Sequence, residues 1–239
     1  MIKKLLLIWC LLPLILNAAD STEFDPGVWK GVGELGYTST SGNSDSENLN
    51  ASLGISREIE KWKHSASLRT IQAESEGETS ADSLVFKGRS EYAFGEKSYV
   101  FGKSRYEDDE FSGYDYQTSV SFGVGSRFIE DEKQLLDASA GLGYRTIKDS
   151  ATKDTEDEAI VTADLIYEYK ISETATFRET ILIESGDENT YSESDTSLTF
   201  RIVGNLAAKI SYLVKRNSEV PPDIDKTDEI TTVSLVYDF

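Results

Sequence analysis

Hydrophobic and polar residues alternate one by one along most of the chain from Val28 onward. Within 48–56, leucine, alanine and isoleucine alternate with asparagine, serine and glycine, and the same period recurs over 114–128, 136–145 and 159–171. A period of two is that of a β-strand with one apolar and one polar face. The pattern therefore predicts an all-β fold.

Twelve candidate strands follow from this alternation. They are predicted at 28–40, 47–58, 62–74, 82–94, 98–107, 114–128, 134–147, 157–171, 174–184, 194–203, 207–215 and 228–239. Most are about as long as a tilted membrane strand must be, roughly 9–11 residues.

The segments between these strands form two groups that alternate along the chain. The long polar links are 41–47, 75–81, 108–113, 148–156, 185–193 and 216–227. The short links are 59–61, 95–97, 129–133, 172–173 and 204–206. Long and short links therefore lie at opposite ends, as in an outer-membrane barrel with short periplasmic turns and long outer loops. We predict a single transmembrane antiparallel β-barrel of the outer-membrane type, with about 12 strands.

Alternation alone does not say which face of the sheet is outside. In a membrane barrel the apolar face meets lipid, whereas a soluble, lipocalin-like barrel has the opposite polarity. Aromatic residues near the predicted strand ends favour the membrane barrel, because such residues form girdles at the two interfaces. These aromatics are Tyr37, Trp62, Tyr92, Phe94, Tyr99, Phe101, Phe128, Tyr144, Tyr167, Tyr169, Tyr212 and Tyr237.

The beginning of the chain has the features of a secretory signal. Lys3 and Lys4 precede an apolar run at 5–16, which is short for a membrane helix and is followed by small residues. We predict a signal peptide at 1–19 and an outer-membrane β-barrel at 20–239. The alternative is an N-terminal membrane anchor.

The last predicted strand ends in an aromatic residue. Val233, Leu235, Tyr237 and Phe239 share one face of it. This arrangement looks like the C-terminal signal that the outer-membrane barrel assembly machinery reads, so that machinery is an expected partner. The alternative is a sheet strand that happens to end in phenylalanine.

The composition excludes several classes of function. The chain has 24 Lys+Arg against 43 Asp+Glu and a formal charge of -19, which argues against nucleic acid as a partner. One Cys and one His exclude a disulfide framework, a cysteine-rich metal site and any site that needs two imidazoles. We assign no catalytic residue, no metal ligand and no cofactor, and we expect outer-membrane lipid and lipopolysaccharide as surroundings.

Several short segments, spread over nearly the whole mature chain, carry a resemblance. They are Trp29–Gly31, Thr38–Ser44, Trp62–His64, Phe111–Gln117, Ser211–Tyr212, Pro221–Pro222, Lys226–Asp228 and Leu235–Phe239. They resemble a Gram-negative family of unknown function named for salt-induced outer membrane proteins. The resemblance implies an outer-membrane location and a link to salt, but no substrate.

The polar face carries charges of both signs on different strands. The candidate pore-lining residues are Arg69, Lys87, Arg89, Lys103 and Arg105 on one side and Asp137, Asp164 and Glu168 on the other. Opposed walls of charge would set a transverse field that selects ions. Alternatively, these charges pair and fill the lumen. The face is ambiguous in 98–107, where Tyr99 and Phe101 share parity with the two basic residues.

Acidic residues gather around three of the predicted outer loops. They are Glu74, Glu76, Glu78 and Asp82, then Glu107, Asp108, Asp109, Glu110 and Asp115, then Asp187, Glu188, Glu193 and Asp195. They could hold divalent cations near lipopolysaccharide, because hard cations prefer oxygen ligands. The interpretation we favour is that they are simply solvated, and no EF-hand spacing is present.

The sole imidazole, His64, shares a face with Trp62, Ala66 and Leu68. Outer-membrane phospholipases use a Ser–His pair on the outer face of a barrel. The sequence has no Gly-x-Ser-x-Gly elbow and no recognisable orienting partner for the histidine, so an interfacial histidine is favoured.

Three functions remain from the sequence. We favour a small passive channel for ions or small solutes, linked to salt or envelope stress. The second is a structural or envelope-stress barrel with a filled lumen and acidic surface loops. The third is a lipid hydrolase that uses His64.

Overall fold

The computed structural model describes residues 27–40, 46–75, 78–109, 112, 114–150, 152–220 and 224–239. They form twelve strands: β1 (Trp29–Thr40), β2 (Ser46–Ile59), β3 (Trp62–Ser75), β4 (Glu78–Ala93), β5 (Ser98–Asp109), β6 (Tyr114–Glu130), β7 (Gln134–Asp149), β8 (Thr155–Lys170), β9 (Ala175–Ser185), β10 (Thr190–Val203), β11 (Leu206–Asn217) and β12 (Thr227–Asp238). The predicted signal peptide at 1–19 lies outside the described residues and stays a prediction. Within the described part, no helix is long and apolar enough to cross a membrane.

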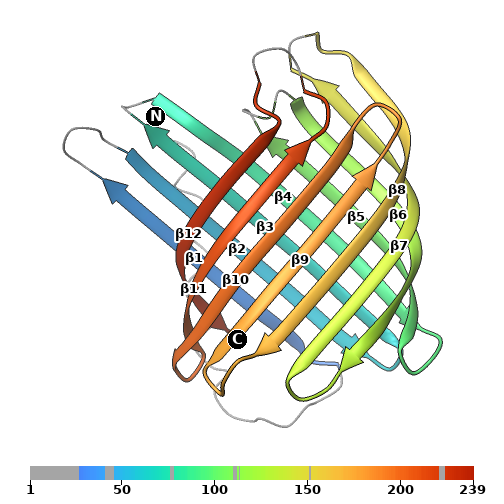
Figure 1. Cartoon of the computed structure of the whole chain (residues 1–239), viewed down its shortest axis with the longest axis vertical. Helices are drawn as coiled ribbons and strands as arrows, with labels where there is room; N and C mark the ends of the chain where they lie inside the picture. The colour runs from blue at the N-terminus through green and yellow to red at the C-terminus, as the bar shows by residue number, and fades with distance from the viewer. Residues whose placement is uncertain are drawn as a thin grey trace.

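The strands form a closed antiparallel barrel, which confirms the predicted fold (Figure 1). Each strand pairs with the next one in the chain, and β1 pairs with β12 from Val32↔Asp238 to Gly36↔Ser234. Beyond Gly36, β1 and β2 lean away from β12. Closure matters because lipid offers no hydrogen bonds to an unpaired sheet edge.

The strands are longer than predicted at the end that carries the long links. β4 begins at Glu78 rather than at 82, and β10 begins at Thr190 rather than at 194. Pairing continues past the apolar part of each strand because polar cross-strand contacts support it there, as between the hydroxyls of Ser185 and Thr190 at 2.9 Å. The links shorten accordingly, and only residues 76–77 separate β3 from β4.

We call the two ends of the barrel the long-loop end and the short-turn end. The short-turn end carries the links 60–61, 94–97, 131–133, 171–174 and 204–205 and the C-terminus of the chain. In the turn between β6 and β7, hydrogen bonds from the backbone amides of Lys133 and Gln134 lower the pKa of Asp131.

The barrel is apolar outside and polar inside. Leu142 and Phe122 point outward and are 70% and 68% exposed. Arg145, Glu184 and Thr162, by contrast, are fully buried in the lumen. A soluble barrel has the reverse arrangement, so the lipocalin-like alternative is wrong.

The seam between β1 and β12 is covered by the C-terminal aromatic ring. The amide of Gly31 donates to the carbonyl of Phe239 at 2.7 Å, and the amide of Phe239 donates back at 2.8 Å. A Cβ atom at Gly31 would lie 2.2 Å from Cε2 of Phe239. The phenylalanine ring therefore occupies the place that a side chain at residue 31 would take.

Gly31→Val tests this packing. We expect the valine to displace the Phe239 ring and lower the free energy of unfolding by about 1 kcal/mol, through lost apolar burial. The measurement is the urea midpoint of the detergent-folded barrel. Gly33→Val is the matched control, because a Cβ there meets no atom within 4 Å. Equal midpoints for the two variants would mean that Phe239 does not secure the seam.

Candidate functional site

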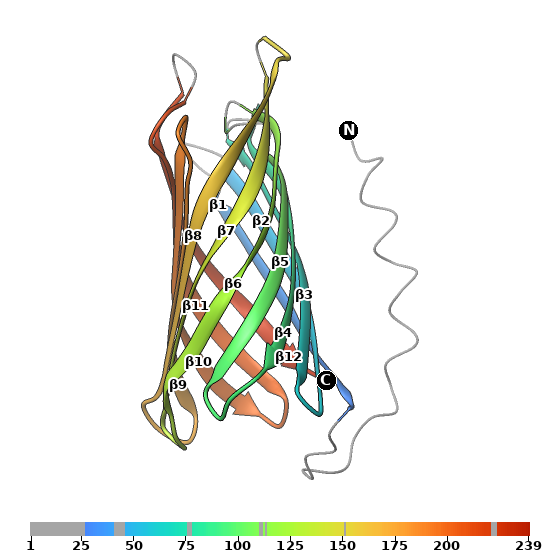
Figure 2. The ribbon, with the colours of Figure 1, turned by 90° about the vertical axis from the view of Figure 1, so that its right-hand side faces the viewer.

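The lumen is narrow in one direction. The barrel is broader in Figure 1 than in Figure 2, so its cross-section is oval. In the closed strand order, β4 lies opposite β10, and β5 lies opposite β11. Side chains from these opposite walls touch each other, and together they form the candidate site.

Three ion pairs connect distant strands across the lumen. Lys87 on β4 lies 2.6 Å from Glu193 on β10, and Lys215 on β11 lies 2.6 Å from Glu107 on β5. A third pair joins Arg69 on β3 to Asp195 on β10 at 2.9 Å. Ions withdrawn from water need close partners of opposite charge, and these pairs supply them.

Arg105 links these pairs into one network. Its guanidinium pairs with Glu107 and lies 4.0 Å above the ring of Tyr191 on β10. The hydroxyl of Tyr191 donates to Glu193 at 2.9 Å. Arg105, Glu107, Tyr191 and Glu193 are all buried, so the network fills the lumen between β5 and β10.

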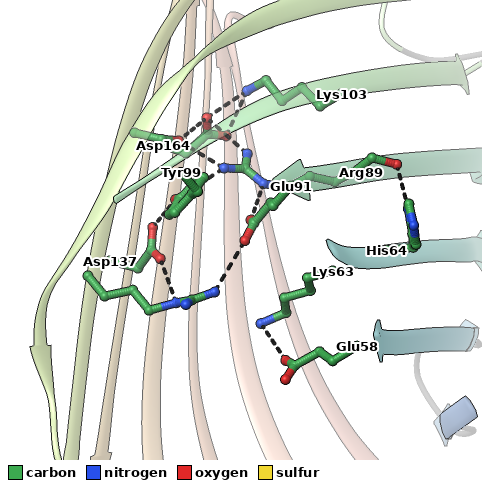
Figure 3. Close-up of polar contacts among 12 residues, drawn as sticks. Glu58, Lys63, His64, Arg89, Glu91, Tyr99, Lys103, Asp137 and Asp164 are labelled. Atoms are coloured by element: carbon green, nitrogen blue, oxygen red, sulfur yellow. Dashed lines mark hydrogen bonds and ion pairs between the residues drawn. The ribbon is translucent and has the colours of Figure 1, made fainter. Parts of the chain in front are cut away.

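A second cluster lies closer to the short-turn end (Figure 3). Arg89 donates to Glu91 at 2.7 Å and lies 3.6 Å from Asp164, which also accepts from Lys103 at 2.7 Å. The hydroxyl of Tyr99 donates to Asp137. This cluster joins β4, β5, β7 and β8 on one side of the lumen.

The structure brings together most of the predicted pore-lining residues. Arg69, Lys87, Arg89, Lys103, Arg105, Asp137 and Asp164 all take part in the two clusters. Glu168 stands apart, paired with Arg178 at 3.1 Å near the short-turn end. The separation into one basic and one acidic wall is wrong, because Glu91, Glu107, Glu193 and Asp195 lie among the basic residues.

The structure also shows which residues of β5 face the lumen. Tyr99 and Phe101 are 1% and 4% exposed, and they share the lumen with Lys103 and Arg105. Their prediction as outer girdle residues is therefore wrong. Gly125 leaves room for this packing, because a Cβ there would lie 2.3 Å from Cζ of Tyr99.

Sequence reasoning missed the partners on the other side of the lumen. The missed residues are Glu34, Glu91, Arg127, Arg145, Glu184, Tyr191, Lys209 and Lys215. Glu107, Glu193 and Asp195 were assigned to outer loops, but they point into the lumen. The signal was present in part, since Tyr191, Glu193 and Asp195 alternate with serines and continue the period of two.

A cavity remains beside the first cluster, and Arg69, Lys87, Glu193 and Lys215 of that cluster line it. It has a volume of about 440 Å³, and its lining extends to the short-turn end, where Val32 is 41% exposed. Its charged lining consists of five basic residues, Arg69, Lys87, Arg178, Lys209 and Lys215, and three acidic ones, Glu34, Glu193 and Asp238. Basic residues therefore outnumber acidic ones in the lining itself, although each of the five basic residues also has a carboxylate partner within 3.1 Å.

The acidic loop residues that the structure describes do not gather into a metal site. Asp115 pairs with Lys153 at 2.9 Å and with Lys148 at 3.3 Å. In the described part of the chain, no group of three His, Cys, Asp or Glu side chains could hold a metal ion.

His64 lies on the outer face, as its alternation predicts. Its Nδ1 is 2.9 Å from Oγ of Ser90, and its ring stacks on Trp62 at 5.6 Å. Among the described residues, no carboxylate contacts the imidazole. A histidine general base needs such an orienting group, so the pair lacks one part of a hydrolytic triad.

Comparison with known proteins assigns the chain to a family. A family model described as "Protein of unknown function, DUF481" matches residues 33–239. The chain belongs to this family. It is also 27% identical, over 92% of its length and 90% of the relative's, to the uncharacterized protein YdiY of Escherichia coli (strain K12). The description of the DUF481 family carries no reference to salt induction.

Solved structures share the fold at low identity. An outer membrane channel from Pseudomonas putida F1 is 10% identical with a TM-score of 0.54, over 93% of this chain and 100% of that one. The NanC porin is 11% identical with a TM-score of 0.53, over 88% and 98%. The fold is thus that of outer-membrane barrels and porins.

The pair that crosses the lumen between β4 and β10 should be important for stability. We expect Glu193→Gln to lower the free energy of unfolding by about 1–3 kcal/mol, because it removes the carboxylate from the Lys87 ammonium, which water reaches only in part since its side chain is 37% exposed. Adding Lys87→Met should restore most of the loss. Urea unfolding in detergent measures both changes.

The exposed pair Lys63–Glu58, 3.4 Å apart, provides the control for that experiment (Figure 3). Glu58→Gln should change the stability by less than about 1 kcal/mol, because water screens this pair. If Glu193→Gln changes the stability no more than Glu58→Gln does, burial in the lumen does not strengthen the Lys87–Glu193 ion pair.

Proposed function

We propose that the protein is a passive channel of the Gram-negative outer membrane for small solutes, with a preference for anions. The observation that carries the proposal is the cavity of about 440 Å³ with its five basic and three acidic residues. An excess of basic over acidic side chains in the lining of a pore favours the entry of anions over cations. The apolar outer face supports the membrane location.

The buried polar atoms of the clusters support a hydrated lumen. Among the described residues, Nε and Nη1 of Arg105, Oε2 of Glu184 and Oδ1 of Asp195 have no protein partner. Buried polar atoms are normally satisfied by water where protein gives no partner. These atoms therefore favour water between the cavity and the long-loop end.

The ion pairs across the lumen favour a second function. Lys87–Glu193 and Glu107–Lys215 join opposite walls, so they are also what a barrel with a filled lumen and a structural role would contain. On the channel proposal, these pairs form the constriction that limits flow. A link to salt or envelope stress fits either function.

Charge reversal in the cavity tests the anion preference. Arg178 lines the cavity and is half exposed, so Arg178→Glu should preserve the fold. We expect the reversal potential in a planar bilayer under a salt gradient to shift toward cations. The matched control is Arg216→Glu on the outward face of β11, which should leave the reversal potential unchanged. A shift of equal size in both variants would mean that surface charge causes the effect and that the cavity does not lie on the path of the ions.

Removal of the constriction separates the channel from the filled barrel. The double variant Lys87→Ala/Glu193→Ala deletes both members of the pair and leaves no unpaired charge. We expect its single-channel conductance to exceed that of the parent protein, because the opposite walls are no longer bridged. Absence of openings in both proteins, with folding verified by gel mobility, would reject the channel and leave the filled barrel.

A further inference from the structure

The outer face of the barrel has a groove that runs over β1 to β6. Its volume is about 470 Å³, and its floor includes Ala66, Gly88 and Gly102. Ile55 and Phe122 form its sides, and both are large exposed apolar residues. A Cβ at Gly102 would lie 3.1 Å from the Phe122 ring, so the missing side chains create the depression.

One end of the groove is polar. His64 and Ser90 line it, and their side chains are 2.9 Å apart (Figure 3). Arg57 is the register partner of both His64 on β3 and Trp29 on β1, and its guanidinium lies 5.8 Å from the Trp29 ring. Among the described residues Arg57 has no carboxylate partner, and its buried Nε has no hydrogen bond. Arg57 thus places a positive charge on the outer face beside His64 and Trp29, two residues that line this end of the groove.

The groove runs from the rim of the barrel into the apolar belt. Trp29 and Trp62 begin their strands at the short-turn end, and His64 lies close by. Phe122, at the far side of the groove, lies in the middle of β6. Tryptophan at this level is typical of a membrane interface, where headgroups meet acyl chains.

We propose that this groove binds a glycerophospholipid of the periplasmic leaflet. The phosphodiester lies against Arg57 and His64, and one acyl chain lies over Gly88 and Gly102. Arginine is suited to phosphate because its planar donors can bind two oxygens at once. The apolar acyl chain fills the apolar part of the groove. The proposal rests on the membrane placement given above, but it does not depend on conduction.

The same geometry argues for binding rather than cleavage. His64 uses Nδ1 toward Ser90, and the described residues offer no carboxylate to orient the imidazole. Without such a group, Ser90 is not an activated nucleophile. The Ser90 hydroxyl instead helps to fix the imidazole at the polar end of the groove.

The test measures phosphatidylglycerol that stays bound to the detergent-folded barrel, counted by native mass spectrometry. We expect Arg57→Gln and Gly88→Leu each to lower retention about tenfold, the first by loss of a charged hydrogen bond and the second by filling the groove. Lys133→Ala, in an exposed turn, and Ala163→Leu, on the outer face of β8, are matched controls that should retain the lipid. Because Arg57 and Gly88 lie outside the lumen, conductance should be unchanged in all four variants.

Three results would overturn the proposal. Parent-level retention in correctly folded Arg57→Gln and Gly88→Leu would remove the site. Equal retention of diacylglycerol, which has no phosphate, would reduce it to general apolar adhesion. Release of fatty acid that disappears in Ser90→Ala would replace binding with hydrolysis. Loss of lipid binding with normal conductance would overturn only this inference, whereas a barrel that stays monomeric without detergent would overturn the membrane placement as well.

Discussion

Charge that is buried inside the barrel must be balanced inside the barrel. The lumen contains Arg69, Lys87, Arg105 and Lys215, and each would be costly to hold there without an acidic partner. The partners Glu193 and Asp195 come from the opposite wall, so the two walls must approach each other closely enough for the side chains to meet. The oval cross-section meets this requirement, because it brings two opposite walls close together (Figures 1 and 2).

Much of the fold could be predicted because its signals are local. Alternation along one strand shows which residues share a face, and this is enough to place Arg69, Lys87 and Asp164 on the polar side. The C-terminal strand could be recognised for the same reason. Strand ends were harder to predict, because pairing beyond the apolar belt depends on polar neighbours on other strands, such as Ser185 and Thr190.

The site could be predicted only in part, because its contacts are not local. Lys87 and Glu193 are more than a hundred residues apart, and no spacing rule joins strands that face each other across a closed barrel. Tyr99 illustrates the second difficulty. An aromatic residue near a strand end is a reasonable girdle residue, and only the room that Gly125 leaves for its ring explains why it lies inside. The sequence shows both residues but not their contact.

The same alternation of polar and apolar residues produces two different surfaces, a charged lumen and an apolar outer face. Inside, long charged side chains fill part of the space, and a cavity lined by five basic and three acidic residues remains beside them. On the proposed channel function, an anion in this cavity would compete with Glu193 for the Lys87 ammonium, because both offer an oxygen to it. The displaced Glu193 carboxylate would keep the hydroxyl of Tyr191 as a donor but lose its closest cation, so the exchange would cost free energy. The ion pair that joins the two walls would therefore also set the barrier on the proposed path.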